Sequence, residues 1–439
     1  MTAASLAKKM RPDLEVVALE KGPWTSYSAC GIPYVICGDV DSIEELVVRS
    51  PEQHRANGID ARAMQEATAI DLDAREVEVR DLDAGRTYRL GFDQLLVATG
   101  ATPRRPPVPG FLHEKVHGVQ TLDDGAHLLR HAKAIGADRV VVVGAGYIGL
   151  EIAEAFVKRG ATVTVVEREP EVLPATMDPE MGAAVRKAME GHGIDVHTGD
   201  GVEGFDGRAV QTASGPIAAD LVVLGLGVTP NSTLANEAGI ALGAHDAVAV
   251  DFRQRTSADG VWAAGDCCES FHLVSQRKVH VALGTVANKQ GRVVGINVGG
   301  GYATFPGVVG TAVTKLCNTE IARTGLNERE AAQVGFGYVV GRIESTTRAG
   351  YFPGTKPISV KILAQPGGGE LLGAQIVGEE GAAKRIDVLA TALTARFTVE
   401  DLLHLDLSYA PPFAPVWDPV LMAARKAWDA VQLERTTRG

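Results

Sequence analysis

Cysteines are few in this sequence, and they are not arranged in pairs. The five of them are odd in number and form neither a Cys-x-x-Cys motif nor a cluster with histidines: Cys30, Cys37, Cys267, Cys268 and Cys317. This pattern argues against a disulfide framework and against a zinc site, so we expect no metal. Free cysteines also indicate a reducing compartment, and we expect the protein in the cytoplasm.

Long apolar runs and an excess of basic residues are also absent. No apolar stretch approaches ~18 residues, so no membrane-spanning segment is predicted. The net charge of −11 argues against nucleic acid as a partner. The 439 residues, 45% of them hydrophobic, are enough for two or three domains with cores of their own.

Glycine is abundant, and one glycine-rich segment carries a complete nucleotide-binding pattern. A valine-rich strand from Arg139 leads into Gly144-Ala-Gly146-Tyr-Ile-Gly149. A helix through Phe156 and a second strand, residues 162–167, follow, and the strand ends at Glu167. Strand, glycine turn, helix, strand and terminal acid within about thirty residues are the full dinucleotide-binding fingerprint.

The N-terminus resembles the second half of the same unit. Residues 3–10 have helical spacing, and residues 14–20 read as a buried strand that ends at Glu20. Gly144 lies 23 residues before Glu167 (167 − 144), and the same distance before Glu20 falls ahead of Met1. We therefore expect the first strand and glycine turn to be missing from the chain and the true start to lie upstream.

Three further apolar runs enter turns rich in small residues: residues 95–103, 221–230 and 260–266. The last ends at Asp266, a side chain suited to accept hydrogen bonds from hydroxyl groups. From about residue 310 the pattern changes to strands followed by helices, which indicates an α+β domain. Asp418-Pro419 is typical of a helix start, and we expect a terminal helix there.

The segment Ser26-Tyr-Ser-Ala-Cys30-Gly-Ile-Pro-Tyr34 isolates one cysteine between small residues and a Gly-x-Pro turn. A thiol without a close partner can act only as a lone nucleophile or electron acceptor. A small buried hydrophobic residue is the alternative. Cys37 as a resolving thiol is a weaker alternative, because the spacing exceeds that of redox pairs.

Together these motifs resemble the flavoprotein disulfide reductase superfamily, in its single-cysteine branch of coenzyme A disulfide reductases and NADH oxidases. The resemblance covers nearly the whole chain. It implies an α/β fold with two Rossmann-like domains, for FAD and NAD(P)H, and a C-terminal α+β domain that forms a homodimer. The implied division is FAD domain 1–110 and 233–308, NAD(P)H domain 111–232 and dimerisation domain 309–439.

The resemblance also implies the cofactor sites. For FAD the residues are Glu20, Lys21, Ser28, Thr99, Gly100, Gly265 and Asp266. For NAD(P)H they are Gly144, Gly146, Tyr147, Ile148, Gly149, Glu167 and Gly227, with Tyr147 as an aromatic gate over the flavin. Glu167 would bind a ribose 2′-hydroxyl and repel a 2′-phosphate, which favours NADH, although Arg168 weakens that inference.

The implied enzyme is an NAD(P)H- and FAD-dependent reductase of coenzyme A disulfide or a related small disulfide or persulfide. Cys30 is its redox centre. Tyr351 and Tyr409, supplied by the partner subunit, would protonate the departing thiolate. Ser26 and Lys9 are expected at the substrate, although Lys9 could equally belong to a solvated helix face.

Two alternatives remain open. One is an NADH oxidase or peroxidase in which Cys30 cycles through sulfenic acid. The other belongs to a different class: a flavin-free dimer that binds NADH without catalysis, which the missing first turn would favour.

Overall fold

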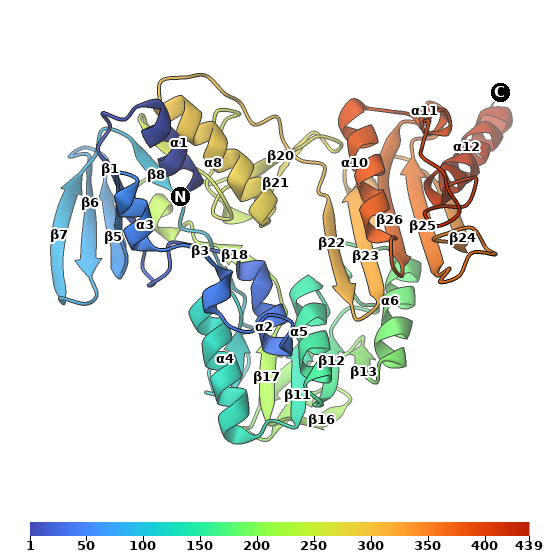
Figure 1. The fold of residues 1–439 in the computed structure, drawn as a ribbon, viewed down its shortest axis with the longest axis horizontal. Coiled ribbons are helices and arrows are strands. Elements are labelled where there is room, and N and C mark those ends of the chain that lie inside the picture. Colours follow the sequence, from blue (N-terminus) through green and yellow to red (C-terminus); the bar gives the residue numbers. More distant parts are fainter. Residues whose placement is uncertain (439) are drawn as a thin grey trace.

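The computed structural model describes residues 1–438. Its sheets follow one another along the long axis, with the N-terminal elements at one end and the C-terminal sheet and helix at the other (Figure 1). The predicted α/β class is confirmed, because parallel strands alternate with helices in the first two thirds of the chain. The division at residues 110, 232 and 308 stays a prediction.

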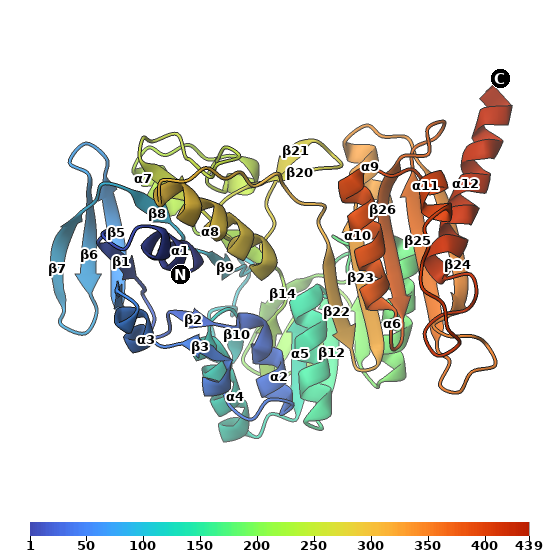
Figure 2. The ribbon, with the colours of Figure 1, turned by 45° about the horizontal axis from the view of Figure 1, so that its top comes forward.

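Two short parallel strand pairs lie in the N-terminal region. β1 (Val16–Leu19) pairs with β4 (Ile59–Arg62), and β8 (Leu95–Val97) pairs with β19 (Val261–Ala263). No hydrogen-bonded strand connects the two pairs within residues 1–438. Helix α1 (Thr2–Met10), at its predicted position, packs against α8 (Gly284–Val298) in both views (Figures 1 and 2).

The remaining elements of this region are short. They are β2 (Ser26–Tyr27) with β3 (Val47–Arg49), the three-stranded meander β5 (Gln65–Asp71), β6 (Glu76–Asp81) and β7 (Arg86–Gly91), the hairpin β20 (Ser270–His272) and β21 (Arg277–Val279), and helices α3 (Pro51–Ala56) and α7 (Thr233–Glu237).

The middle region contains a five-stranded parallel sheet. Its strands run in the order β10 (Val116–Gly118), β17 (Leu221–Leu224), β11 (Arg139–Val143), β12 (Thr162–Glu167) and β13 (Asp195–Thr198). The predicted strand, turn, helix and strand are confirmed as β11, the turn after it, α5 (Tyr147–Lys158) and β12. The turn needs its glycines, because a Cβ on Gly149 would lie 2.1 Å from the carbonyl oxygen of Gly144.

Two helices flank this sheet besides α5. Thr121 and Asp124 form a capping box that begins α4 (Leu122–Ile135), and α6 (Pro179–Gly191) connects β12 to β13. A meander of β14 (Val202–Phe205), β15 (Ala209–Thr212) and β16 (Gly215–Ala218) follows β13. β9 (Ala101–Pro103) pairs with β18 (Val228–Pro230) where the chain enters and leaves this region.

The C-terminal region is built on an antiparallel sheet. The order is β22 (Ala312–Leu316), β23 (Thr319–Gly325), β26 (Leu371–Gly378), β25 (Pro357–Ala364) and β24 (Val339–Thr346). Its helices are α9 (Glu328–Gln333), α10 (Ile386–Ala395), α11 (Val399–Leu403) and the predicted terminal helix α12 (Pro419–Arg438). The strands and helices predicted after about residue 310 are confirmed by these elements.

A buried lysine joins the middle and C-terminal regions. Lys361 of β25 is fully buried, and its ammonium lies 2.8 Å from Asp178, beside α6, and 2.5 Å from Glu328 of α9. Glu180 of α6 is a third carboxylate partner. Because breaking a buried pair leaves a charge without compensation, this cluster fixes α6 against the sheet. None of the helices in residues 1–438 combines the length and apolarity needed to cross a membrane.

Candidate active site

Cys30 lies at an accessible turn. It occupies the 3-10 turn Ala29–Gly31, immediately before α2 (Ile32–Cys37), and is exposed with a free thiol. The backbone N–H of Ser28 donates to the carbonyl of Leu46 at 2.9 Å and holds the turn. Gly31 is required at the next position, since a Cβ there would lie 2.3 Å from Leu46 Cδ2. The exposed thiol argues against a purely structural cysteine.

Carboxylates from two separate regions act on this thiol. Burial of its environment is the main cause that raises the pKa of Cys30, and the charge of Glu151 on α5 raises it further, as does Asp266 after β19. The structure therefore brings Asp266 within electrostatic range of Cys30, together with Glu151, which the motifs did not indicate. An uncompensated negative charge next to a thiol keeps it protonated.

The carboxylate of Asp266 is available to a ligand. The group is half-buried, burial raises its pKa, and its side chain accepts no hydrogen bond from residues 1–438. Its neighbour Gly265 has a φ of 89°, and the N–H of Gly265 donates to Gln290 at 2.8 Å. A half-buried carboxylate acceptor beside a glycine, where a ligand can come close to the backbone, suits the hydroxyl groups of a ribityl chain. This observation supports an FAD site.

The other residues predicted for FAD lie at strand ends. Glu20 follows β1, accepts a hydrogen bond from Gly22 N–H at 2.8 Å, and has a pKa raised by burial. Lys21 forms an ion pair of 2.8 Å with Glu66 instead of remaining free for a ligand. Thr99 donates through Oγ1 to the carbonyl of Asn231 at 2.5 Å. The left-handed φ of 71° at Gly100 then requires glycine.

The turn after β11 has the geometry of a pyrophosphate cradle. Gly144 has a φ of 97°, and Gly146 is the N-cap of α5 without a side chain to block its amides. Glu167, at the end of β12, accepts a hydrogen bond of 2.9 Å from Ala145 N–H through Oε2 and one of 3.0 Å from Glu169 N–H through Oε1. The carboxylate is thus held at the turn, where a nucleotide ribose would lie.

Arg168, next to Glu167, points into solvent. Its side chain is 82% exposed and pairs with Glu169 at 3.1 Å. Gly227, also predicted for NAD(P)H, follows β17 with a φ of 77°. Ile148 lies in the first turn of α5.

Tyr147 begins α5, and its hydroxyl is buried without a hydrogen-bond partner among residues 1–438. Burial is the main cause that raises its pKa. A buried hydroxyl in this state can be satisfied by a water molecule or a ligand. The assignment of Tyr147 as a gate stays a prediction.

The sequence motifs did not predict a charged network beside Cys30. Glu154 of α5 is buried and lies 3.0 Å from both Lys158 and Lys315, the latter on β22. Glu151, one turn earlier, accepts a hydrogen bond of 2.8 Å from Thr314 of the same strand, and burial raises its pKa. The sequence spacing does place Tyr147, Glu151 and Glu154 on one face of a helix. It does not predict that β22 packs against that face.

The two predicted tyrosines lie together. Ala349 N–H donates to the carbonyl of Pro411 at 3.1 Å, which joins the loops that carry Tyr351 and Tyr409. Both side chains are exposed, and Tyr351 raises the pKa of Tyr409, after desolvation, by its charge and a hydrogen bond. β24 and β25, which flank Tyr351, are separated from α2 by the other strands of the C-terminal sheet in both views (Figures 1 and 2).

The two residues predicted at the substrate differ in their surroundings. The Ser26 hydroxyl is 3.0 Å from His54 Nε2 and forms a hydrogen bond with it. Lys9 is exposed in the last turn of α1. Their substrate contacts stay predictions.

Comparison with known proteins agrees with this geometry. Residues 1–291 match the family described as pyridine nucleotide-disulphide oxidoreductase, and residues 311–419 match the dimerisation domain of that family. The chain is 38% identical over 433 residues to the NAD(P)H sulfur oxidoreductase (CoA-dependent) of Pyrococcus abyssi, covering 97% of this chain and 95% of that protein.

Two further similarities are informative. The NADH oxidase of Methanocaldococcus jannaschii is 36% identical over 433 residues, 97% of this chain and 96% of that protein. The crystal structure of reduced Bacillus anthracis CoADR-RHD superimposes with a TM-score of 0.95 at 32% identity, covering 98% of this chain and 78% of that chain.

Proposed function

The chain belongs to the pyridine nucleotide-disulphide oxidoreductase family, and we propose that it uses NAD(P)H and FAD to reduce coenzyme A disulfide, or a related small disulfide or persulfide, at Cys30. The observation that carries this proposal is the exposed lone thiol of Cys30, which lies within electrostatic reach of the Asp266 carboxylate. The coenzyme A dependence named for the Pyrococcus relative supports the substrate class.

The residues present fit both cofactors. Asp266 and Glu20 would hold FAD through its hydroxyl groups, and the turn Gly144–Gly149 with Glu167 would hold NAD(P)H. When bound, FAD accepts a hydride from NAD(P)H and supplies two electrons to a disulfide. The position of Glu167 and the solvent-facing Arg168 support NADH as the preferred donor.

Cys30 performs the covalent step. Its thiolate attacks one sulfur of the substrate disulfide, so that a Cys30–substrate disulfide forms and the first thiol leaves with a proton. Two electrons and a second proton then break this mixed disulfide, release the second thiol and restore the Cys30 thiolate. The net reaction converts one NAD(P)H, one proton and one disulfide into NAD(P)⁺ and two thiols.

The dimerisation domain indicates a homodimer. We propose further that Tyr351 and Tyr409 reach Cys30 of the partner subunit and protonate the departing thiolate. Their exposure and their separation from α2 within one chain support this arrangement.

An assay of thiol release tests the proposal. The purified flavoprotein is given NADH and coenzyme A disulfide without oxygen, and free thiols are counted against NADH consumed. We expect two thiols per NADH, loss of release in Cys30→Ser and normal release in Cys37→Ser. A Cys30→Ser variant that still releases thiol would exclude the mechanism, and a colourless wild-type protein would favour the flavin-free alternative.

An oxidase is the second candidate, favoured by the Methanocaldococcus relative. In that reaction the accessible Cys30 cycles between thiolate and sulfenic acid. The same sample distinguishes the two functions, because the oxidase consumes NADH only after oxygen or peroxide is admitted.

A further inference from the structure

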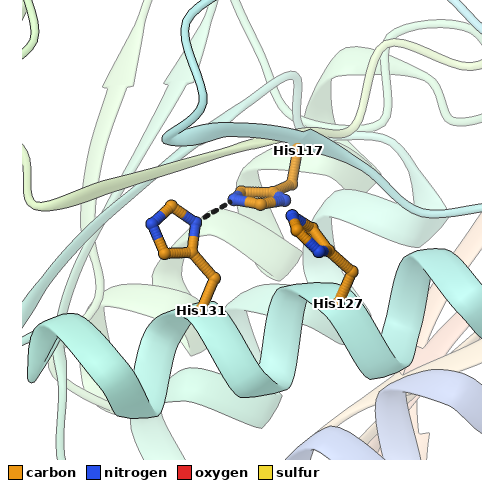
Figure 3. A group of neighbouring side chains, drawn as sticks. All are labelled: His117, His127 and His131. Carbon is orange, nitrogen blue, oxygen red and sulfur yellow. Dashed lines mark hydrogen bonds between the residues drawn. The ribbon is translucent and has the colours of Figure 1, made fainter.

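Three histidines gather on one side of the middle region, outside every residue assigned to the redox reaction. His117 lies on the edge strand β10 and is buried, whereas His127 and His131 lie four residues apart on α4. Figure 3 shows the three rings facing one another, with two of them rising from the same helix. The short connection between β10 and α4 brings the strand histidine over the helix pair.

The spacing of the ring nitrogens suits a single cation. Nε2 of His117 and Nδ1 of His131 form a hydrogen bond of 2.9 Å, and one nitrogen of each ring lies within 4.8 Å of the others. A tetrahedral zinc ion with Zn–N bonds of about 2.0–2.1 Å places its ligand nitrogens about 3.3 Å apart. The rings must therefore rotate to bring nitrogens that lie within 4.8 Å of one another to the spacing of a bound ion.

Two other charged groups near the rings are engaged in hydrogen bonds of their own. Asp124 lies on the same helix face, but its Oδ2 accepts hydrogen bonds from Thr121 N–H at 2.8 Å and Gln120 N–H at 3.1 Å. The nearby Arg105 guanidinium is held by the carbonyls of Phe111 and Val116. An all-nitrogen site disfavours Ca²⁺ and Mg²⁺, which prefer oxygen, and suits Zn²⁺, Co²⁺, Ni²⁺ or Cu²⁺.

We propose that His117, His127 and His131 form a binding site for a divalent transition-metal ion, Zn²⁺ in the first instance, with a water molecule as the fourth ligand. The cation takes the place of the proton between His117 and His131. The ring that donated this proton carries it on its other nitrogen, so all three imidazoles stay neutral. This proposal revises the expectation of no metal, which rested on the cysteine pattern.

A bound ion would cross-link two elements of the fold. It ties the edge strand β10 to α4, and α4 packs on α2, the helix that follows Cys30. A Cβ on Gly125 of α4 would lie 2.5 Å from Ile32 Cγ2 of α2, so the two helices are in close contact. A metal ion bound by the histidines therefore stabilises α4, and through α4 the helix α2 that follows Cys30, without contacting the thiol.

A cluster of carboxylates elsewhere in residues 1–438 carries no such site. Asp178, Glu180 and Glu328 also converge, but the buried ammonium of Lys361 occupies the space between them.

Metal titration of the dimeric flavoprotein tests the proposal. The exposed Cys30 thiol also binds zinc, so the titration uses Cys30→Ser protein treated with a chelator and then with Zn²⁺ or Co²⁺. We expect one ion per chain and a rise of the melting temperature. The Co²⁺ spectrum should show visible d–d bands of tetrahedral coordination without a sulfur charge-transfer band.

Two single variants and a matched control decide the outcome. His127→Ala and His131→Ala, each on the same Cys30→Ser background, should weaken binding at least about tenfold. His404→Ala removes an exposed histidine elsewhere and should change nothing. Equal stoichiometry and affinity in all variants would overturn the proposal, as would the absence of any binding by the parent protein.

Discussion

Lys315 of β22 lies 3.0 Å from Glu154 of α5, and this ion pair joins the C-terminal sheet to the helix that begins at the nucleotide turn. Glu154 is buried, so its carboxylate depends on Lys315 and on Lys158 for compensation. The contact connects two regions of the chain beside the reactive thiol.

Removal of that lysine should weaken the junction. Lys315→Met leaves Glu154 with one partner and should destabilise the protein by about 1 kcal/mol, because Lys158 still compensates part of the buried charge. We expect the melting temperature to fall by about 2 °C. Arg342→Ala breaks an exposed pair with Glu344 and should have little effect, so equal shifts in the two variants would contradict this role.

Glu151 should control the ionisation of Cys30. The negative charge of Glu151 raises the pKa of the thiol, so Glu151→Gln lowers that pKa and the thiolate persists to lower pH. Alkylation of the reduced enzyme by iodoacetamide, followed on the Cys30 peptide at about pH 8, should become about two- to tenfold faster. Glu190→Gln on α6 serves as the control, and an unchanged pH profile in Glu151→Gln would show that its charge does not reach the thiol.

Glu167 should determine the choice of nicotinamide cofactor. Glu167→Gln keeps an acceptor for Ala145 N–H but removes the charge that repels a 2′-phosphate. We expect the ratio of kcat/KM for NADH to that for NADPH to fall by about tenfold or more. Glu203→Gln, at an exposed glutamate of β14, should leave the ratio unchanged, and the assignment fails if both variants behave alike.

Tyr351 and Tyr409 should matter for thiol release and not for flavin reduction. Because desolvation and then Tyr351 raise the pKa of Tyr409, this phenol keeps its proton throughout the neutral range and can donate it. The double variant Tyr351→Phe/Tyr409→Phe should slow turnover with coenzyme A disulfide by about 10²-fold.

Rapid-reaction kinetics separates the two steps of that test. Reduction of the flavin by NADH should proceed at the normal rate in the double variant, and Tyr302→Phe, at an exposed tyrosine elsewhere, should behave as wild type. Slowing of flavin reduction to the same extent would show that the tyrosines act on structure and not on the departing thiolate.

The sequence alone determined the local elements and the class of chemistry. The valine run before Gly144, the glycine spacing and the acid at Glu167 depend on contacts within about thirty residues, which is why the turn and its helix are readable without a structure. The isolation of Cys30 between small residues likewise needs no tertiary information.

Only the tertiary structure decided which distant groups act together. Lys315 reaches Glu154, and the charge of Asp266 acts on Cys30, through the packing of separate regions, and no periodicity encodes such pairings. The third histidine of the metal site illustrates the same limit. His127 and His131 are paired by helical spacing, but His117 joins them only because β10 folds back over α4, and a ligand set depends on distances in space and not on separations along the chain.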